Sequence, residues 1–220
     1  WKPSPHTIPQ LILLWNFGLE EVVEGNLIQT YVYETLPYAA GGSMEEKNPG
    51  APVKPGDTIV LRNGYHGELW LRGAFNPDYI TIRAEQGHTP VLSRIFLSAV
   101  KGWKIIGLTV KAEAAPVYTR NTLIEVESHG WHGPSSYVTI QGCSLVSVND
   151  ASSWTASDWD TLSCNGIMVS GNWMTITGNQ CRNINFGISV NGNNATVRSN
   201  VIANFAGDGL RGLGDDLLFE

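Results

Sequence analysis

The sequence predicts an all-β protein whose chain winds into stacked coils, a β-solenoid. The first observation is a repeat: residues 166–172 (GIMVSGN) return 21 residues later as 187–193 (GISVNGN), and again as 209–215 (GLRGLGD). The second is that each copy alternates apolar and polar residues and ends in Gly and Asn or Asp. The third is the composition, 24 Gly among 220 residues with 42% hydrophobic residues. A fixed period of short alternating runs favours stacked coils, and an ordinary antiparallel sandwich is the alternative.

The repeat also predicts which side chains are buried. One coil cannot bury its own apolar side chains, but coils stacked about 4.8 Å apart can. Because side chains alternate along a strand, the residues between the buried ones point outward. We therefore expect one interior column, Ile124, Ile167, Ile188 and Leu210, and two outward rows, Met168, Ser189 and Arg211 beside Ser170, Asn191 and Leu213.

The repeat pattern divides the chain in two. Residues 57–220 carry it, and we expect the coils to continue beyond Glu220, through further chain or another subunit, because 217–220 matches only part of a coil. Residues 1–56 lack the pattern and are expected to form an N-terminal cap with its entry loop, since a solenoid end needs covering. Within this cap we expect a short helix over 17–24 and a strand over 27–33.

Charge and cysteine content exclude several classes of function. The formal charge of -6, without a cluster of basic residues, argues against a nucleic-acid partner. The apolar run over 8–15 is too short and too poorly flanked to be a signal peptide or a membrane span. Cys143 and Cys181 fall on adjacent coils with an offset of two residues, which places their Cα atoms roughly 8 Å apart. We expect free, buried thiols.

Two coils carry additional residues, within 111–136 and 148–163. Solenoids accommodate insertions as loops around a binding face. These loops contain Trp131, Trp154 and Trp159, next to Asp, Ser and Asn. Such tryptophans can stack on sugar rings, or they can simply fix the loops to the coils. We expect the loops to form one wall of a groove that binds carbohydrate.

Three further segments carry a resemblance to a known family. They are 54–65 (KPGDTIVLRNGY), 80–85 (ITIRAE) and 207–212 (GDGLRG). With these segments, the chain resembles the right-handed parallel β-helix proteins of the pectate-lyase-like superfamily, in particular polysaccharide lyases of the chondroitinase B and alginate lyase kind. The resemblance covers 54–220 and implies a single-stranded right-handed parallel β-helix. It also implies a secreted, extracellular or periplasmic enzyme that cleaves an acidic, uronate-containing polysaccharide.

The resemblance implies roles for particular residues. Glu125 and Glu127 point outward in the predicted alignment and, with an Asn amide, could bind the Ca²⁺ that similar lyases use beside the uronate carboxylate. The basic groups implied for proton transfer and charge neutralisation are Arg211, Lys111 and His132. No lysine follows Lys111, so the base could also lie beyond Glu220. Ser189 and Asn191 would contact the substrate.

Two other functions remain open. A hydrolase would use paired carboxylates, for which Asp208, Asp215 and Asp216 are candidates, although Asp in Gly-Asp-Gly and Gly-Asp-Asp more often caps a turn. A non-catalytic β-helix module, such as a tail spike, adhesin or surface-assembly component, would bind glycans without cleaving them.

Overall fold

The computed structural model describes residues 11–14, 36, 40 and 53–220. The helix predicted over 17–24, the strand predicted over 27–33 and most of the predicted cap lie outside the described residues. Within the cap region lies an additional strand that was not expected from the sequence, β1 (Leu11–Leu14), which pairs in parallel with β2 (Thr58–Leu61).

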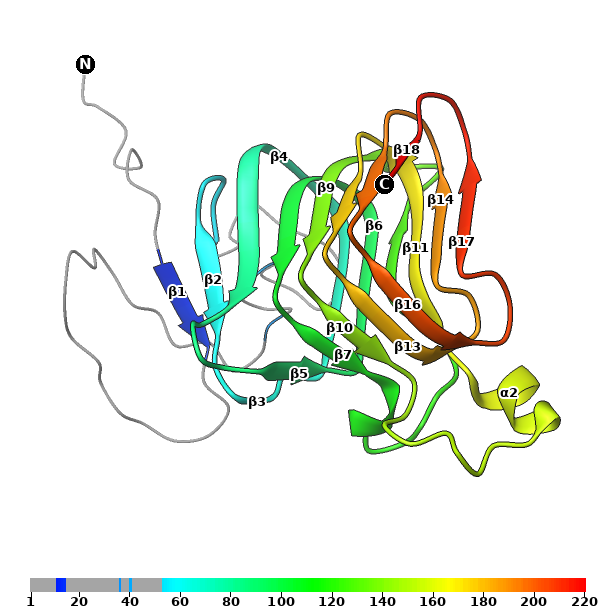
Figure 1. The fold of residues 1–220 in the computed structure, drawn as a ribbon. Coiled ribbons are helices and arrows are strands. Elements are labelled where there is room, and N and C mark those ends of the chain that lie inside the picture. Colours follow the sequence, from blue (N-terminus) through cyan, green and yellow to red (C-terminus); the bar gives the residue numbers. More distant parts are fainter. Residues whose placement is uncertain (1–10, 15–35, 37–39, 41–52) are drawn as a thin grey trace, which may run out of the picture.

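The described residues form two sheets, and every pairing between the strands is parallel (Figure 1). The alternative of an antiparallel sandwich is therefore wrong. One sheet, called here the large sheet, has 12 strands. Besides β1 and β2 it contains β4 (Glu68–Ala84), β6 (Arg94–Ile106), β8 (Thr122–Glu127), β9 (Ser135–Gln141), β11 (Asn165–Asn172), β12 (Thr175–Thr177), β14 (Ile188–Asn191), β15 (Thr196–Arg198), β17 (Leu210–Leu213) and β18 (Leu218–Phe219).

The second sheet, called here the small sheet, has 6 strands. They are β3 (Gly64–Tyr65), β5 (Pro90–Leu92), β7 (Thr109–Lys111), β10 (Ser144–Val146), β13 (Gln180–Ile184) and β16 (Val201–Phe205). Within 53–220 two helices occur between strands, the 3-10 helix η1 (Ala112–Ala114) and α2 (Ala156–Leu162). Neither of these helices has the length and apolar character that crossing a bilayer requires.

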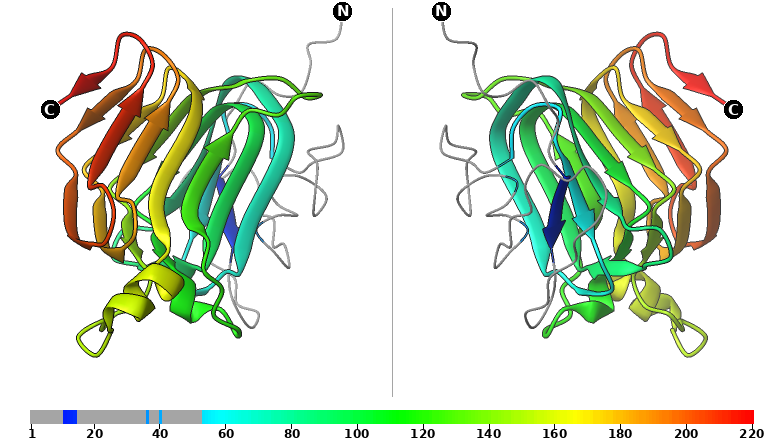
Figure 2. Two further views of the ribbon diagram at one scale, coloured as in Figure 1. Left: turned by 90° about the vertical axis from the view of Figure 1, so that its right-hand side faces the viewer. Right: turned by 90° about the vertical axis from the view of Figure 1, so that its left-hand side faces the viewer.

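The chain alternates between the sheets in a fixed order. After β10 in the small sheet come β11 and β12 in the large sheet, then β13, then β14 and β15, then β16, and finally β17 and β18. Strands that occupy the same place in successive repeats lie side by side (Figure 2). This order keeps the 21-residue period of the sequence in spatial register, because each repeat contributes one strand to the small sheet and two to the large one.

The interior column is confirmed. Ile167 pairs with Ile124 on one side and with Ile188 on the other, and Ile188 pairs with Leu210. The three isoleucines are no more than 1% exposed, while Leu210 on the last repeat is 46% exposed. Ile and Val suit this position because their β-branched side chains pack well on a pleated surface.

The buried side chain of Asn179 is hydrogen-bonded to both neighbouring repeats. Asn179 is fully buried, and its Oδ1 accepts from the backbone N–H of Cys143 at 2.9 Å. Its Nδ2 donates to Oδ1 of Asn200, one repeat further on, at 2.9 Å.

All three cysteines are free and buried, as expected. Burial raises the pKa of the Cys143 thiol from 9.0 to about 11 and that of Cys181 to about 12.

One position that recurs in these repeats, two residues before β12, β15 and β18 and inside β9, has a left-handed backbone. Asn194 and Asp216 occupy this position in the last repeats, with φ of 58° and 55°. Asn and Asp tolerate this conformation better than other residues with a side chain. In two earlier repeats the position holds aromatic residues, Tyr137 and Trp173, each with φ of 54°. Aromatic residues are uncommon there.

Candidate functional site

A groove lies over the outward face of the large sheet, across β8, β11, β14 and β17. Its volume is about 400 Å³. Most of its polar and charged side chains belong to the outward rows that the sequence predicts. The groove is lined by Glu125, Val126, Glu127, Ser128, Met168, Val169, Ser170, Ser189, Asn191, Arg211 and Leu213.

Strand alternation and register bring these side chains together. Met168 pairs with Glu125 and with Ser189, and Ser189 pairs with Arg211. Ser170 pairs with Asn191, which pairs with Leu213. Both predicted outward rows are thus present in the structure, and the groove follows them across four strands.

The acidic end of the groove is on β8. Glu125 forms an ion pair with Arg94 of β6, with 2.7 Å between Nη2 and Oε2. Glu127 accepts a hydrogen bond from the hydroxyl of Ser98 at 2.9 Å, and within the described residues it forms no ion pair. The groove therefore contains one carboxylate that is paired with a guanidinium and one that accepts a hydrogen bond from a hydroxyl.

The basic end of the groove is on β17. Arg211 is exposed, and no carboxylate in the described chain forms an ion pair with it. Three strand spacings separate it from Glu125, which corresponds to about 14 Å between their Cα atoms. Ser189 and Asn191 lie between these ends, so hydroxyl and amide groups connect an acidic and a basic region.

The donor set does not fit a Ca²⁺ site built from protein ligands. Calcium takes about six to eight oxygen ligands. Here Glu125 is already bound by Arg94, and Glu127 is the one remaining carboxylate of the lining. Within the described residues no group of three or more His, Cys, Asp or Glu side chains is placed to hold a metal ion.

Two predicted basic residues lie outside the groove lining. Lys111 belongs to β7 in the small sheet, where its Nζ is 2.7 Å from Oε1 of Glu113. His132 belongs to the loop 128–134 and packs against His129, with 5.0 Å between ring centroids. Of the three residues predicted to be catalytic, Arg211 alone reaches the groove, because Lys111 lies on a different sheet and the loop of His132 extends away from the lining.

The extra residues of 111–136 form two loops, 112–121 before β8 and 128–134 after it. The first lies against the segment containing α2, where the Tyr118 hydroxyl donates to the carbonyl of Leu162 at 2.5 Å, but none of its residues and none of 148–163 lines the groove.

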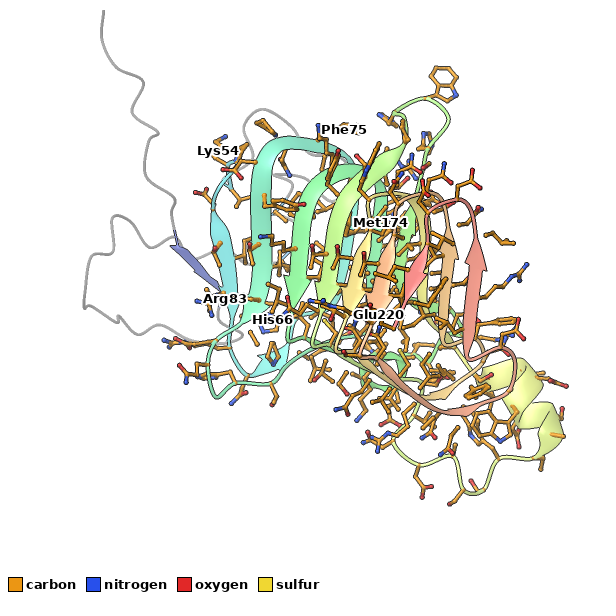
Figure 3. The ribbon with its side chains drawn as sticks, turned by 45° about the horizontal axis from the view of Figure 1, so that its top comes forward. Lys54, His66, Phe75, Arg83, Met174 and Glu220 are labelled. Atoms are coloured by element: carbon orange, nitrogen blue, oxygen red, sulfur yellow. The ribbon has the colours of Figure 1, made fainter. Side chains whose placement is uncertain are left out.

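The segment containing α2 extends from the end where β11 begins, whereas the loop 128–134 follows the end of β8 (Figure 2). Gly133 of this loop lies over Phe75 on β4, because a Cβ added to Gly133 would lie 3.9 Å from the Phe75 Cζ. Phe75 marks that end of the sheet in Figure 3. Ser128 is the one residue from either loop in the lining.

The three loop tryptophans accordingly lie outside the groove lining. Trp131 is 95% exposed. Trp154 packs edge to face on Trp159 of α2, with 5.0 Å between their ring centroids, and α2 begins with a capping box at Thr155 and Asp158. The two tryptophans therefore pack on each other within their own loop.

The three carboxylates considered for a hydrolase also lie outside the lining. They are Asp208, Asp215 and Asp216. Asp216 has the left-handed backbone of a turn, which matches the expectation that Asp in the sequence Gly-Asp-Asp caps a turn.

An aromatic surface that was not predicted from the repeat continues beyond the acidic end of the groove. Phe96 on β6 pairs with Glu125, and its ring lies 5.9 Å from that of Trp70 on β4. The guanidinium of Arg94 lies over Phe96, at 5.0 Å from the ring centroid. The sequence did contain a signal for this surface. Side chains alternate between the two faces of a strand, and this alternation within 68–72 and 94–98 places the rings of Trp70 and Phe96 on the outward face.

Searches against protein-family models, curated proteins and solved structures found no match to this chain.

Proposed function

We propose that the chain is a single-stranded right-handed parallel β-helix similar to the pectate-lyase-like superfamily. The supporting observation is the fixed alternation of one small-sheet strand with two large-sheet strands, all paired in parallel. A chain that coils in one direction produces such an order, because each coil adds one strand to every face.

We further propose that the groove binds an acidic, uronate-containing polysaccharide. The observation that carries this proposal is Arg211, an exposed guanidinium without an ion pair in the described chain, in a groove whose other polar groups are hydroxyls, an amide and carboxylates. A guanidinium binds a carboxylate with two parallel hydrogen bonds. Ser170, Ser189 and Asn191 would hydrogen-bond sugar hydroxyls, and the rings of Phe96 and Trp70 would stack on the next sugars.

The reaction proposed for this groove is β-elimination. A base removes the proton on the carbon next to the uronate carboxylate, and the electron pair of that C–H bond forms a C=C bond with the carbon that carries the glycosidic oxygen. The glycosidic C–O bond breaks as the protonated base returns its proton to the leaving oxygen. Arg211, three strand spacings or about 14 Å from β8, would bind a uronate carboxylate on a neighbouring sugar of the same polymer. Glu127 would act as the base, because Lys111 and His132 lie outside the lining and Glu125 is bound by Arg94. The proposed location is outside the cytoplasm, where such polymers occur.

The test combines product formation with binding across pectate, alginate, chondroitin and hyaluronan. Unsaturated product is followed by its ultraviolet absorbance, and affinity by calorimetry. Glu127→Gln should lower the rate of product formation about 100-fold or more while the polymer still binds. Arg211→Ala should weaken binding, and Arg198→Ala, an exposed arginine on β15, is its matched control.

Binding without product in the unsubstituted protein would assign it to the non-catalytic alternative. If none of these polymers binds, the proposed function is wrong.

A further inference from the structure

A second cavity, of about 240 Å³, lies on a different part of the large sheet. It is lined by Asn76, Pro77, Asp78, Tyr79, Lys101, Gly102 and Tyr137. We infer that this cavity and the aromatic pair beside it form a second saccharide subsite, which binds a sugar unit carrying an anionic group. The choice of a saccharide rests on the function proposed above.

The cavity is a slot between two tyrosines. Ile80 pairs with Trp103, and Trp103 pairs with Val138, so the preceding residues Tyr79, Gly102 and Tyr137 follow one another across β4, β6 and β9. A Cβ at Gly102 would lie 3.0 Å from the carbonyl oxygen of Asn76 and 3.3 Å from that of Asp78, so residues 76–78 close over Gly102 and line the cavity between the two tyrosines. Two strand spacings, about 9.6 Å, separate β4 from β9 here, and both tyrosines line the cavity.

An exposed aromatic platform adjoins the slot. The rings of Tyr137 and Trp173 are stacked, with an interplanar angle of 3° and 5.1 Å between centroids. They are 39% and 47% exposed, so burial in the core does not account for their presence. Both have the left-handed backbone that Gly102, Asn194 and Asp216 adopt at the equivalent position. Backbone strain at exposed aromatic residues points to a binding role.

The slot is also basic. The Nζ of Lys101 lies 5.6 Å from the ring centroid of Tyr137, and that of Lys104 lies 4.4 Å from the ring centroid of Tyr79. Neither ammonium group forms an ion pair with a carboxylate of the described chain. Two ammonium groups beside two aromatic rings fit a ligand that combines a flat apolar face with a carboxylate or sulfate.

The slot and the groove are separate sites. The first half of β6 pairs with β8 below the groove, whereas its second half pairs with β9 below the slot. The linings of the two cavities share no residue. A polymer could therefore occupy both, or the slot could hold a neighbouring chain segment while the groove holds the reacting one.

The test uses substitutions that keep the backbone. Tyr137→Asn and Trp173→Asn introduce the residue that the next repeat carries at position 194, so the left-handed conformation is retained and the ring is removed. Lys101→Gln combined with Lys104→Gln removes the charge, and Arg198→Gln on the same sheet is the control. Affinity is measured by calorimetry for an oligogalacturonate, a sulfated oligosaccharide and an uncharged cello-oligosaccharide. All variants are prepared with and without Arg211→Ala.

In the Arg211→Ala background, each Asn variant should lower the affinity for an anionic oligosaccharide about tenfold. The double lysine variant should lower it similarly and reduce its dependence on salt, while leaving the uncharged ligand unaffected. The carboxylate and sulfate ligands report which anionic group is preferred.

The two proposals fail in different ways. If the Asn and Gln variants bind all three ligands as the unsubstituted protein does, the slot is not a saccharide site, whatever Arg211→Ala does. If these variants lose affinity while Arg211→Ala and Glu127→Gln change neither binding nor product, the slot is the binding site and the function proposed for the groove is wrong.

Discussion

Arg94 of β6 holds the carboxylate of Glu125 on β8 through a contact of 2.7 Å between Nη2 and Oε2. The two side chains are each 29% exposed, and Arg94 also lies over the ring of Phe96. Arg94 therefore offsets the charge of the Glu125 carboxylate in a groove that we propose to bind an acidic polymer.

Removing this guanidinium should weaken binding more than it weakens the fold. Arg94→Met should lower the affinity for an acidic oligosaccharide, since Glu125 would then repel the ligand. The free energy of unfolding should fall by no more than about 1 kcal/mol, because the pair is partly exposed. The double variant Arg94→Met with Glu125→Gln should regain affinity. Calorimetry and denaturant titration measure both effects, and a double variant as weak as Arg94→Met would contradict the charge argument.

Glycan binding should not depend on calcium. The groove has too few free carboxylates for a Ca²⁺ site of protein ligands. Adding a chelator, and then excess Ca²⁺, should change affinity and product formation by less than about twofold. A loss of activity with chelator that Ca²⁺ restores would show that the ion takes part after all.

The interior column allows a matched pair of stability tests. Ile188 is 1% exposed and Leu210 is 46% exposed, although they are neighbours in the same column. Ile188→Ala should lower the free energy of unfolding by about 2–5 kcal/mol, through lost burial and the cavity left behind. Leu210→Ala should cost much less. Equal losses in denaturant titrations would mean that the column is not packed as described.

The buried thiols predict a dependence of stability on pH. Burial raises the pKa of Cys143 to about 11 and that of Cys181 to about 12, so the folded state favours their neutral forms. Their contribution to stability is complete below the ordinary thiol pKa of 9.0 and is lost as pH rises towards these values. Stability should therefore fall above pH 9.0, and the fall should be smaller in Cys181→Ala. An unchanged pH profile in this variant would contradict the assignment.

The sequence predicted the all-β class and the groove rows because both depend on period. A repeat of constant length fixes the register, so Met168, Ser189 and Arg211 had to align once strands were assumed. Alternation within 123–127 then placed Glu125 and Glu127 on the same face. The strand β1 could not be predicted, because the four residues of Leu11–Leu14 lie outside the repeat.

The rest of the site could not be predicted from the repeat, because the repeat does not show which distant side chains meet or where the inserted loops lie. The partner of Glu125 is Arg94, 31 positions earlier, across an insertion that breaks the period. The insertions were visible in the sequence, but nothing showed which end of the strands each would extend from. For the same reason Trp131, Trp154 and Trp159 were expected beside the groove. Only the structure revealed that Tyr137 and Trp173 occupy the recurring left-handed position.

The most direct test of the central claim is the affinity of the groove for the uronate polymer that the unsubstituted protein binds best. Arg211→Ala should lower this affinity about tenfold or more, as expected for the loss of a guanidinium that binds a carboxylate. Arg198→Ala, an exposed arginine outside the groove, should leave it within about twofold. Equal affinities for the unsubstituted protein and Arg211→Ala would contradict the claim that this groove recognises an acidic polysaccharide.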